Sequence, residues 1–245
     1  MRLFQVPIAH RGLHDETSPE NSLSAYKKAV EHGYNIETDV HLLKDGKVVC
    51  FHDFSVGRMI KGKSDKIEDL TYEDLCKDEY LLPNGERIPL FEELIGLVDG
   101  KVDILCELKS INFYKFDLES KVYELIKGKP WIKVQAFNPF TIVWFAKNAP
   151  EVCRGQLATN PANSILRFLQ SVAGPFRMLK RSRPDFLAYD ILKLPDQKIN
   201  EIVKKYNMKL LTWTVDTDEK VATAHGSNAD NIIFEKIRPV SFKEN

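Results

Sequence analysis

The chain has 245 residues, with 35 Lys and Arg against 35 Asp and Glu, so its formal net charge is zero at pH 7. A neutral total excludes a uniformly basic surface that would bind nucleic acid by counterion release, and it also excludes a polyacidic tail. A small basic pocket for a single phosphate stays compatible with these totals. No apolar stretch approaches the roughly 20 residues that span a bilayer, so stable membrane insertion is not expected.

Two further features predict a cytoplasmic protein. Residues 1–7 lack the apolar region and cleavage site of a signal peptide. The cysteines are widely spaced, without a Cys-x-x-Cys pair, and two of them lie in apolar runs where a free thiol behaves as a small hydrophobic group. We therefore expect reduced thiols at Cys50, Cys76, Cys106 and Cys153.

Short apolar runs alternate with longer amphipathic stretches along the chain. The predicted strands, in chain order, are 6–10, 34–42, 47–52, 102–108, 132–137, 153–158, 186–191, 209–215 and 231–234. The predicted helices are 22–31, 90–98, 118–127, 139–148, 164–172, 196–206 and 219–225. Most helices fall between two strands, which is the order of a parallel α/β fold.

Nine strands are one too many for a closed eight-stranded barrel. Asp45-Gly46 is a strong hairpin-turn signal, so residues 48–52 return antiparallel to the strand before them and leave the parallel set. The remaining eight, in about 250 residues, predict a (β/α)8 barrel. A doubly wound open sheet is the alternative, but its first loop should be Gly-rich, and Arg11-Gly12-Leu13-His14 is not.

Residues about 54–100 interrupt this rhythm. They are rich in charge and contain turn signals such as Pro83-Asn84-Gly85. Because they are too few for a core of their own, we expect a small cap inserted over one barrel face, within a single domain of residues 1–245.

Polar residues stand at the carboxyl ends of the predicted strands, where barrel enzymes carry their chemistry. Glu37 and Asp39 alternate with apolar residues, so both side chains point into the barrel, and Glu107 ends another apolar strand. Inward carboxylates are unfavourable without a compensating cation. All-oxygen ligands favour one divalent cation, Mg²⁺ or Ca²⁺. The alternative is ordinary ion pairing of these carboxylates with Arg11 or Lys109.

Two histidines are expected beside these carboxylates. His10 ends the first strand, and the returning hairpin arm ends at His52. Two imidazoles flanking a metal suit phosphodiester cleavage, since one can accept and the other donate a proton near neutral pH. The alternative is a purely structural role for each. His41 shares the parity of Glu37 and Asp39 and could approach the metal, but we expect it to be solvated at the hairpin base.

Several short motifs follow one another in a specific order and spacing. They are Ile8-Ala9-His10-Arg11-Gly12, Pro19-Glu20-Asn21-Ser22, Gly33, Glu37-Thr38-Asp39-Val40, Lys44-Asp45-Gly46, His52-Asp53 and Cys106-Glu107-Leu108-Lys109. Through these motifs the chain resembles the glycerophosphodiester phosphodiesterase family. Weaker matches are Gln135-Ala136-Phe137-Asn138 and Trp213-Thr214-Val215-Asp216. The resemblance is therefore highly specific over the first 110 residues and thin after them.

The resemblance implies a (β/α)8 barrel with a cap after His52 that hydrolyses small glycerophosphodiesters to an alcohol and sn-glycerol 3-phosphate. It leaves open whether water or the substrate's own 2-hydroxyl attacks first. The roles it implies are general base for His10, general acid for His52, metal binding for Glu37, Asp39 and Glu107, phosphate binding for Arg11 and Lys109, and lining of the glycerol or head-group side for Trp213.

Two departures from the family pattern concern the substrate. Phe234 replaces a small polar residue of the last strand, and we expect it to narrow the pocket at the barrel mouth; Gln135-Ala136 replaces a serine region. Two other functions stay open. One is hydrolysis of lysophospholipids or phosphoinositides, which would call for an exposed apolar rim or a basic amphipathic helix. The other is a non-catalytic barrel that binds a phosphodiester or a metal.

Overall fold

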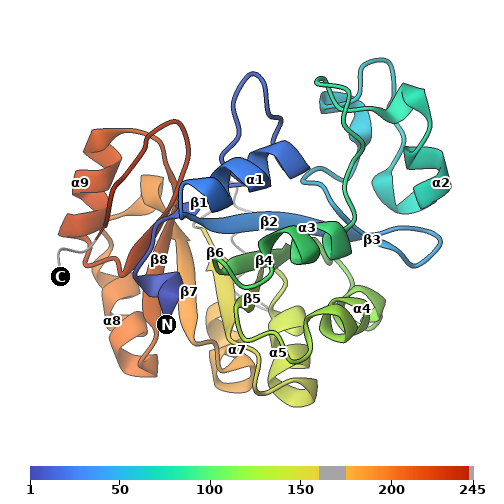
Figure 1. Ribbon diagram of the computed structural model, residues 1–245. Helices are drawn as coiled ribbons and strands as arrows, with labels where there is room; N and C mark the ends of the chain where they lie inside the picture. Colours follow the sequence, from blue (N-terminus) through green and yellow to red (C-terminus); the bar gives the residue numbers. More distant parts are fainter. Residues whose placement is uncertain (160–174, 243–245) are drawn as a thin grey trace.

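A closed barrel of parallel strands forms the centre of the molecule (Figure 1). The structure is a computed structural model that describes residues 1–159 and 175–242. Its barrel strands are β1 (Ile8–Ala9), β2 (Asn35–Leu42), β4 (Ile104–Leu108), β5 (Ile132–Ala136), β6 (Arg154–Ala158), β7 (Phe186–Asp190), β8 (Lys209–Val215) and β9 (Asn231–Phe234). Because β1 pairs in parallel with both β2 and β9, the sheet closes, which confirms the (β/α)8 barrel and makes the open-sheet alternative wrong.

Helices cover the outside of the barrel. They are α1 (Leu23–Glu31), α3 (Phe91–Val98), α4 (Asp117–Ile126), α5 (Pro139–Asn148), α7 (Pro175–Ser182), α8 (Gln197–Tyr206) and α9 (Asp218–Gly226). Local signals set several of their starts: the Ser22 hydroxyl accepts a hydrogen bond from the Ala25 N–H, and Pro139 opens α5. Helix α7 was not predicted, and the predicted helix 164–172 lies outside the described residues. No helix in the described ranges is both long and apolar enough to cross a bilayer.

The barrel interior is filled by a separate apolar cluster that lies below the polar strand ends. Ile8, Leu105, Leu157, Phe186 and Ile233 are among its buried members. Gly155 makes this packing possible, because a Cβ at that position would lie 1.9 Å from the ring of Phe186. A larger cluster fills the layer between strands and helices. The solid interior leaves the carboxyl ends of the strands as the place for polar side chains.

The hairpin expected at Asp45-Gly46 is present. Gly46 has a φ of 79°, and β3 (Val48–Cys50) pairs antiparallel with β2, so that Val40 faces Cys50. This confirms that the run after the turn does not belong to the parallel barrel.

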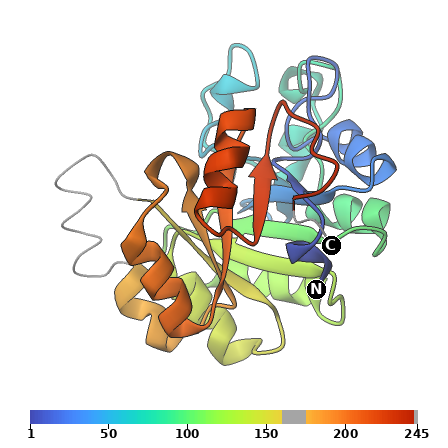
Figure 2. The same ribbon diagram turned by 90° about the vertical axis from the view of Figure 1, so that its left-hand side faces the viewer.

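The segment between β3 and α3 forms a cap beside the barrel (Figures 1 and 2). It contains η2 (Val56–Arg58), η3 (Ile67–Asp69), α2 (Tyr72–Leu75) and η4 (Asp78–Tyr80). We expected this segment to be too short for a core of its own, and its buried residues Val56, Ile67 and Leu75 belong to a cluster that it shares with the hairpin. Hairpin residues supply part of this cluster, which is why so short a segment can bury apolar surface. Helix α3, which follows the cap, instead packs into the larger cluster between the barrel strands and the helices.

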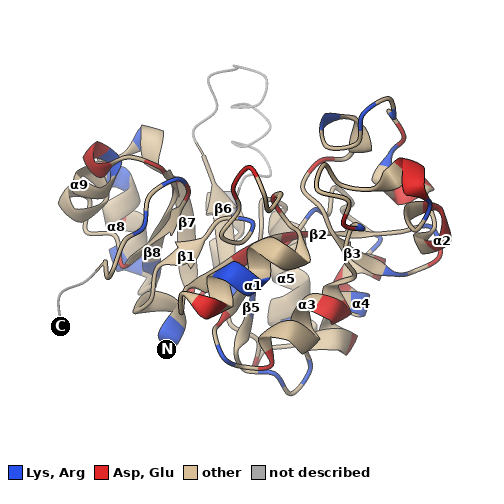
Figure 3. Ribbon diagram, turned by 45° about the horizontal axis from the view of Figure 1, so that its top comes forward, with Lys and Arg blue, Asp and Glu red and all other residues tan. Residues whose placement is uncertain are grey.

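Charges of both signs are interspersed over the helices and the cap in the view of Figure 3. In that view neither sign of charge gathers on one side of the ribbon. This distribution agrees with a protein that does not use a broad basic surface to bind nucleic acid.

Candidate active site

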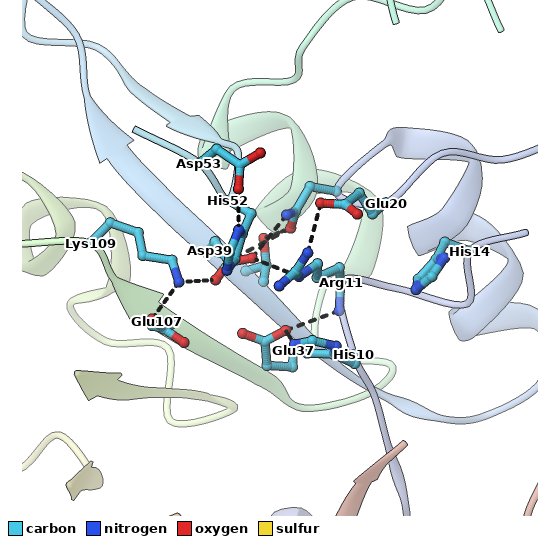
Figure 4. Close-up of polar contacts among 12 residues, drawn as sticks. His10, Arg11, His14, Glu20, Glu37, Asp39, His52, Asp53, Glu107 and Lys109 are labelled. Carbon is cyan, nitrogen blue, oxygen red and sulfur yellow. Dashed lines mark hydrogen bonds and ion pairs between the residues drawn. The ribbon is translucent and has the colours of Figure 1, made fainter. Parts of the chain in front are cut away.

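Three carboxylates converge at the carboxyl ends of β2 and β4 (Figure 4). Glu37, Asp39 and Glu107 are buried, and each offers an oxygen within 4.8 Å of those of the other two. The parallel register explains the convergence, since Asp39 pairs with Glu107 while Glu37 lies one inward position earlier on β2. The structure thus brings together the residues predicted to hold a metal; their role as ligands stays a prediction.

The electrostatics of this cluster fit a cation. Burial, together with the neighbouring charges of Asp39 and Glu107, raises the pKa of Glu37 well above its usual value. Burial also raises the pKa of Glu107 to about 7, against the opposing effect of Lys109. Among the described residues, Oε1 of Glu37 is buried without a hydrogen-bond donor. A buried carboxylate oxygen without a partner is unfavourable, and a divalent cation would supply the missing positive charge.

Asp39 differs from the other two because two cations contact it. Lys109 Nζ lies 2.8 Å from Oδ1 of Asp39 and 2.5 Å from Oε1 of Glu107, and Arg11 Nε lies 3.4 Å from Oδ2 of Asp39. Burial alone would raise the pKa of Asp39, but Lys109 and Arg11 hold it well below its usual value. The ion pairs considered as an alternative are therefore present, alongside a carboxylate cluster that they only partly neutralise.

The turn after β1 places Arg11. Its φ is 54°, a left-handed conformation, and its backbone N–H donates to Oε2 of Glu37 at 2.9 Å. The next residue is Gly12, with a φ of 80°, where a Cβ would lie 3.0 Å from Ala25. The guanidinium donates from Nη1 to Oε1 of Glu20 at 2.9 Å. The turn therefore fixes both the backbone and the side chain of Arg11 against carboxylates.

Each of the two histidines has its Nδ1 on a carboxylate. Nδ1 of His10 lies 2.5 Å from Oε1 of Glu235, and Nδ1 of His52 lies 2.6 Å from Oδ1 of Asp53. Because a carboxylate accepts, this pairing places the proton on Nδ1 and leaves Nε2 free to exchange a proton. Nε2 of His10 lies 3.8 Å from Oε2 of Glu37, and both imidazoles line the same pocket.

Glu235, which follows β9, is the residue that sequence reasoning missed. It contacts His10 and lies 3.5 Å from Nε2 of His14. Burial alone would raise its pKa, but the hydrogen bond from His10 and the nearby ring of His14 hold the pKa well below its usual value. Like His10 and Lys109, Glu235 directly follows a barrel strand, and this position could have identified it as a candidate site residue.

The expectation for Phe234 is wrong. Its ring is buried among the residues between barrel and helices and makes an edge contact with Tyr34 at 4.8 Å between ring centroids. The preceding residue, Ile233, lines the pocket instead. Because side chains alternate along a strand, a difference of one position moves a residue from the mouth to the outer face. Phe234 therefore does not narrow the pocket.

The expectation that His41 is solvated is also wrong. Its side chain is fully buried, because the cap covers the hairpin base. Its Nε2 lies 3.3 Å from the backbone oxygen of His52, its Nδ1 lies 3.8 Å from Oε1 of Glu68, and its ring makes an edge contact with Phe54. His41 thus contacts the segment that carries His52 rather than the carboxylate cluster.

These groups line one pocket at the barrel mouth. Its lining residues are His10, Arg11, Glu37, His52, Glu107, Lys109, Gln135, Phe137, Leu157, Trp213, Thr214 and Ile233. Trp213 and Phe137 form an aromatic wall, with ring centroids 5.7 Å apart. Both Trp213 Nε1 and Gln135 Oε1 are buried without a hydrogen-bond partner among the described residues. A polar ligand that fills the pocket would satisfy such groups.

A closed parallel barrel with polar strand ends gathered in one pocket has the architecture of a (β/α)8-barrel enzyme. The sequence model of the glycerophosphoryl diester phosphodiesterase family matches residues 10–238. This chain belongs to that family.

Relatives and solved structures agree with this assignment. The chain is 33% identical over 241 residues to a glycerophosphodiester phosphodiesterase of Caldanaerobacter subterraneus subsp. tengcongensis, and the match covers 92% of each chain. The structure of a glycerophosphodiester phosphodiesterase from Parabacteroides distasonis superposes with a TM-score of 0.72 at 26% identity, covering 94% of this chain and 92% of that one. A Thermotoga maritima enzyme of the same name gives 0.74 at 25% identity, covering 94% of each chain.

Proposed function

We propose that this enzyme hydrolyses small glycerophosphodiesters to an alcohol and sn-glycerol 3-phosphate, using one divalent cation and the imidazoles of His10 and His52. Family membership supports the reaction class. The observation that carries the mechanism is one pocket in which both imidazoles lie beside a buried carboxylate cluster with unbalanced negative charge.

Glu37, Asp39 and Glu107 would hold the cation, and their oxygen-only donor set favours Mg²⁺ or Ca²⁺. When bound, the cation supplies Lewis-acid stabilisation of negative charge on the phosphoryl oxygens. Arg11 and Lys109 contact the same carboxylates and would bind the remaining phosphate charge. The phosphate is thereby held between the cluster and these two cations.

The acid and base roles follow from the two Nδ1 contacts. Glu235 keeps the Nδ1 proton of His10, so that Nε2 can accept a proton from the attacking hydroxyl. Asp53 contacts His52 in the same way, and a protonated Nε2 would donate to the leaving alkoxide. Burial, together with Lys109 and Arg11, lowers the pKa of His52, which makes its proton easier to transfer.

The test measures release of sn-glycerol 3-phosphate from glycerophosphocholine and glycerophosphoethanolamine with Mg²⁺ or Ca²⁺, after EDTA, and after metal is restored. His10→Ala and His52→Ala should each abolish most turnover, whereas His32→Ala, an exposed histidine at the end of α1, should not. Absence of metal-dependent turnover on these substrates and on glycerophosphoinositol would show that the proposed activity is wrong.

A lysophospholipid is the second candidate substrate, because the loop after β4 exposes apolar side chains. Ile111, Phe113 and Tyr114 are 61%, 61% and 77% exposed. Such side chains, a few residues after the proposed phosphate-binding Lys109, offer contacts for an acyl chain. Turnover of lysophosphatidylcholine that exceeds turnover of glycerophosphocholine, and that falls in Phe113→Ser, would favour this substrate.

Two further assignments complete the proposal. The cap and the barrel form one domain, because hairpin residues Leu43 and Val49 belong to the cap cluster. A single thermal unfolding transition would support this, and two separate transitions would contradict it.

The location is cytoplasmic, in agreement with four free cysteines, and cell fractionation tests it.

A further inference from the structure

A second cleft adjoins the catalytic pocket. It lies between the end of the β2–β3 hairpin, the cap and the start of α4. Its lining residues are Leu42, Leu43, Glu68, Lys109, Ser110, Asn112, Lys115, Asp117, Leu118 and Glu119. Lys109 lines both cavities, so a molecule whose phosphate contacts Lys109 has the second cleft directly beside it.

This cleft lies on the His52 side of the site. Glu68 in its wall lies 3.8 Å from Nδ1 of His41, and Nε2 of His41 lies 3.3 Å from the backbone oxygen of His52. Trp213 and Phe137 line the catalytic pocket but not this cleft. With His52 as the proposed proton donor, the leaving alcohol would depart on this side, and the aromatic wall would remain for the glycerol.

The lining combines apolar and acidic groups. Leu42, Leu43 and Leu118 supply the apolar part, and Glu68, Asp117 and Glu119 supply carboxylates. Of the two lysines, Lys109 is already paired with Asp39 and Glu107, and Lys115 is exposed to solvent. The carboxylates therefore outnumber the cations that remain for a ligand.

Glu119 gives independent evidence that a partner is missing. Its side chain is fully buried, although it belongs to the first turn of α4. Oε1 accepts a hydrogen bond from the Thr141 hydroxyl at 2.5 Å, but Oε2 is buried and accepts none from any residue that the structure describes. A buried carboxylate oxygen without a donor is unfavourable, and a ligand cation would satisfy it.

We propose that this cleft binds the ammonium group of a cationic leaving alcohol, such as ethanolamine or choline. The inference rests on the proposed hydrolase function and adds a substrate class to it. The carboxylates match the positive nitrogen, and the leucines match its methylene or methyl groups. In the reaction the P–O bond to this alcohol breaks, water supplies the new oxygen on phosphorus, and the alcohol oxygen takes the proton from His52.

The experiment compares kcat and KM for two cationic substrates, glycerophosphoethanolamine and glycerophosphocholine, with those for neutral glycerophosphoglycerol. Glu119→Gln keeps the acceptor for Thr141 but removes the charge, and should raise KM for the cationic substrates about tenfold, equivalent to about 1.4 kcal/mol. KM for glycerophosphoglycerol should stay within about twofold, because its head group carries no charge.

Glu68→Lys provides a second variant in case Glu119→Gln folds poorly, because the Glu68 side chain is 44% exposed. It should also raise KM selectively for the cationic substrates. Glu124→Gln, an exposed carboxylate on the same helix, is the matched control and should change neither class.

The outcomes separate the two proposals. If the wild-type enzyme turns over all three substrates and the variants lose activity equally on all of them, or on none, the head-group site is wrong while the hydrolase function stands. If the wild-type enzyme turns over none of them, the hydrolase function fails, and the head-group site fails with it. Only a selective loss on the cationic substrates supports the inference.

Discussion

The two histidines of the site occupy different parts of the molecule. His10 directly follows barrel strand β1, its side chain is 14% exposed, and its partner Glu235 comes from the opposite end of the chain through the pairing of β1 with β9. His52 follows the hairpin, its side chain is 32% exposed, and its partner is the adjacent Asp53. Barrel closure therefore fixes the first imidazole, whereas local chain geometry and the cap fix the second.

The loop that carries His52 has one further connection to the barrel, through the cap. Arg58 of the cap contacts Asp53 through Nε and Glu20 through Nη2, at 2.5 and 2.6 Å, and Glu20 also accepts from Arg11. A line of charged contacts thus joins the loop that carries His52 to the turn that carries Arg11. Because barrel closure holds His10, we expect single substitutions of its strand-end neighbours to lower activity strongly. We expect substitutions of the neighbours of His52 to lower activity less.

Replacement of either histidine should give the largest effect. We expect His10→Ala and His52→Ala each to lower kcat/KM by about 10³-fold on an alkyl head group, within the usual range for a lost general acid or base. With a p-nitrophenyl leaving group, which needs no proton, only His10→Ala should stay strongly impaired. Equal impairment of both variants on that substrate would contradict the division into base and acid.

Loss of a carboxylate from the cluster comes next. Glu37→Gln keeps the shape and an acceptor for the Arg11 N–H, but removes the charge that burial already makes unfavourable. We expect apparent affinity for Mg²⁺ or Ca²⁺ to fall about 100-fold, with activity partly restored at high metal concentration. The measurement is a metal titration of activity and of thermal stability. An unchanged titration would remove Glu37 from the metal site.

Much of this arrangement was predictable from the sequence, for physical reasons. The two-residue period of strands placed Glu37 and Asp39 on one face, and Asp45-Gly46 fixed the hairpin that returns His52 to the site. Glu235 was missed because its contact with His10 spans 225 positions and exists only after the barrel closes. The error on Phe234 has the same origin, since the exact parity of the last strand depends on that closure.

The sequence indicated an inserted cap but not how the cap packs, for a different reason. Its short elements bury apolar residues only jointly with the hairpin, so the buried cluster cannot be recognised from local periodicity. The burial of His41 and the contacts of Arg58 follow from where the cap lies against the hairpin. Neither could be derived from residue spacing.

Substitution of the carboxylate partners of the two histidines compares directly how the two imidazoles are held. Glu235→Gln should lower kcat by about 30-fold with little change in KM, because His10 loses the acceptor that fixes its tautomer. Asp53→Asn should lower kcat less, by about fivefold, because His52 is more exposed to water. Steady-state kinetics of both variants decide this. A larger loss of kcat in Asp53→Asn than in Glu235→Gln would mean that His52, and not His10, is the more rigidly held imidazole.

The smallest expected effect concerns the connection through Arg58. The Arg58 side chain is 46% exposed, so solvent screens its ion pairs and each is worth about 1 kcal/mol or less. Arg58→Gln should therefore lower kcat only about threefold, with a similar loss at each leaving group, because it loosens the His52 loop without removing a proton donor. Lys63→Gln, which removes an ion pair with the exposed Glu79 elsewhere in the cap, is the control and should leave kcat unchanged. A loss of kcat in Arg58→Gln as large as that in His52→Ala would contradict this expectation. It would mean that the position of His52 depends on the contacts of Arg58 as strongly as the position of His10 depends on Glu235.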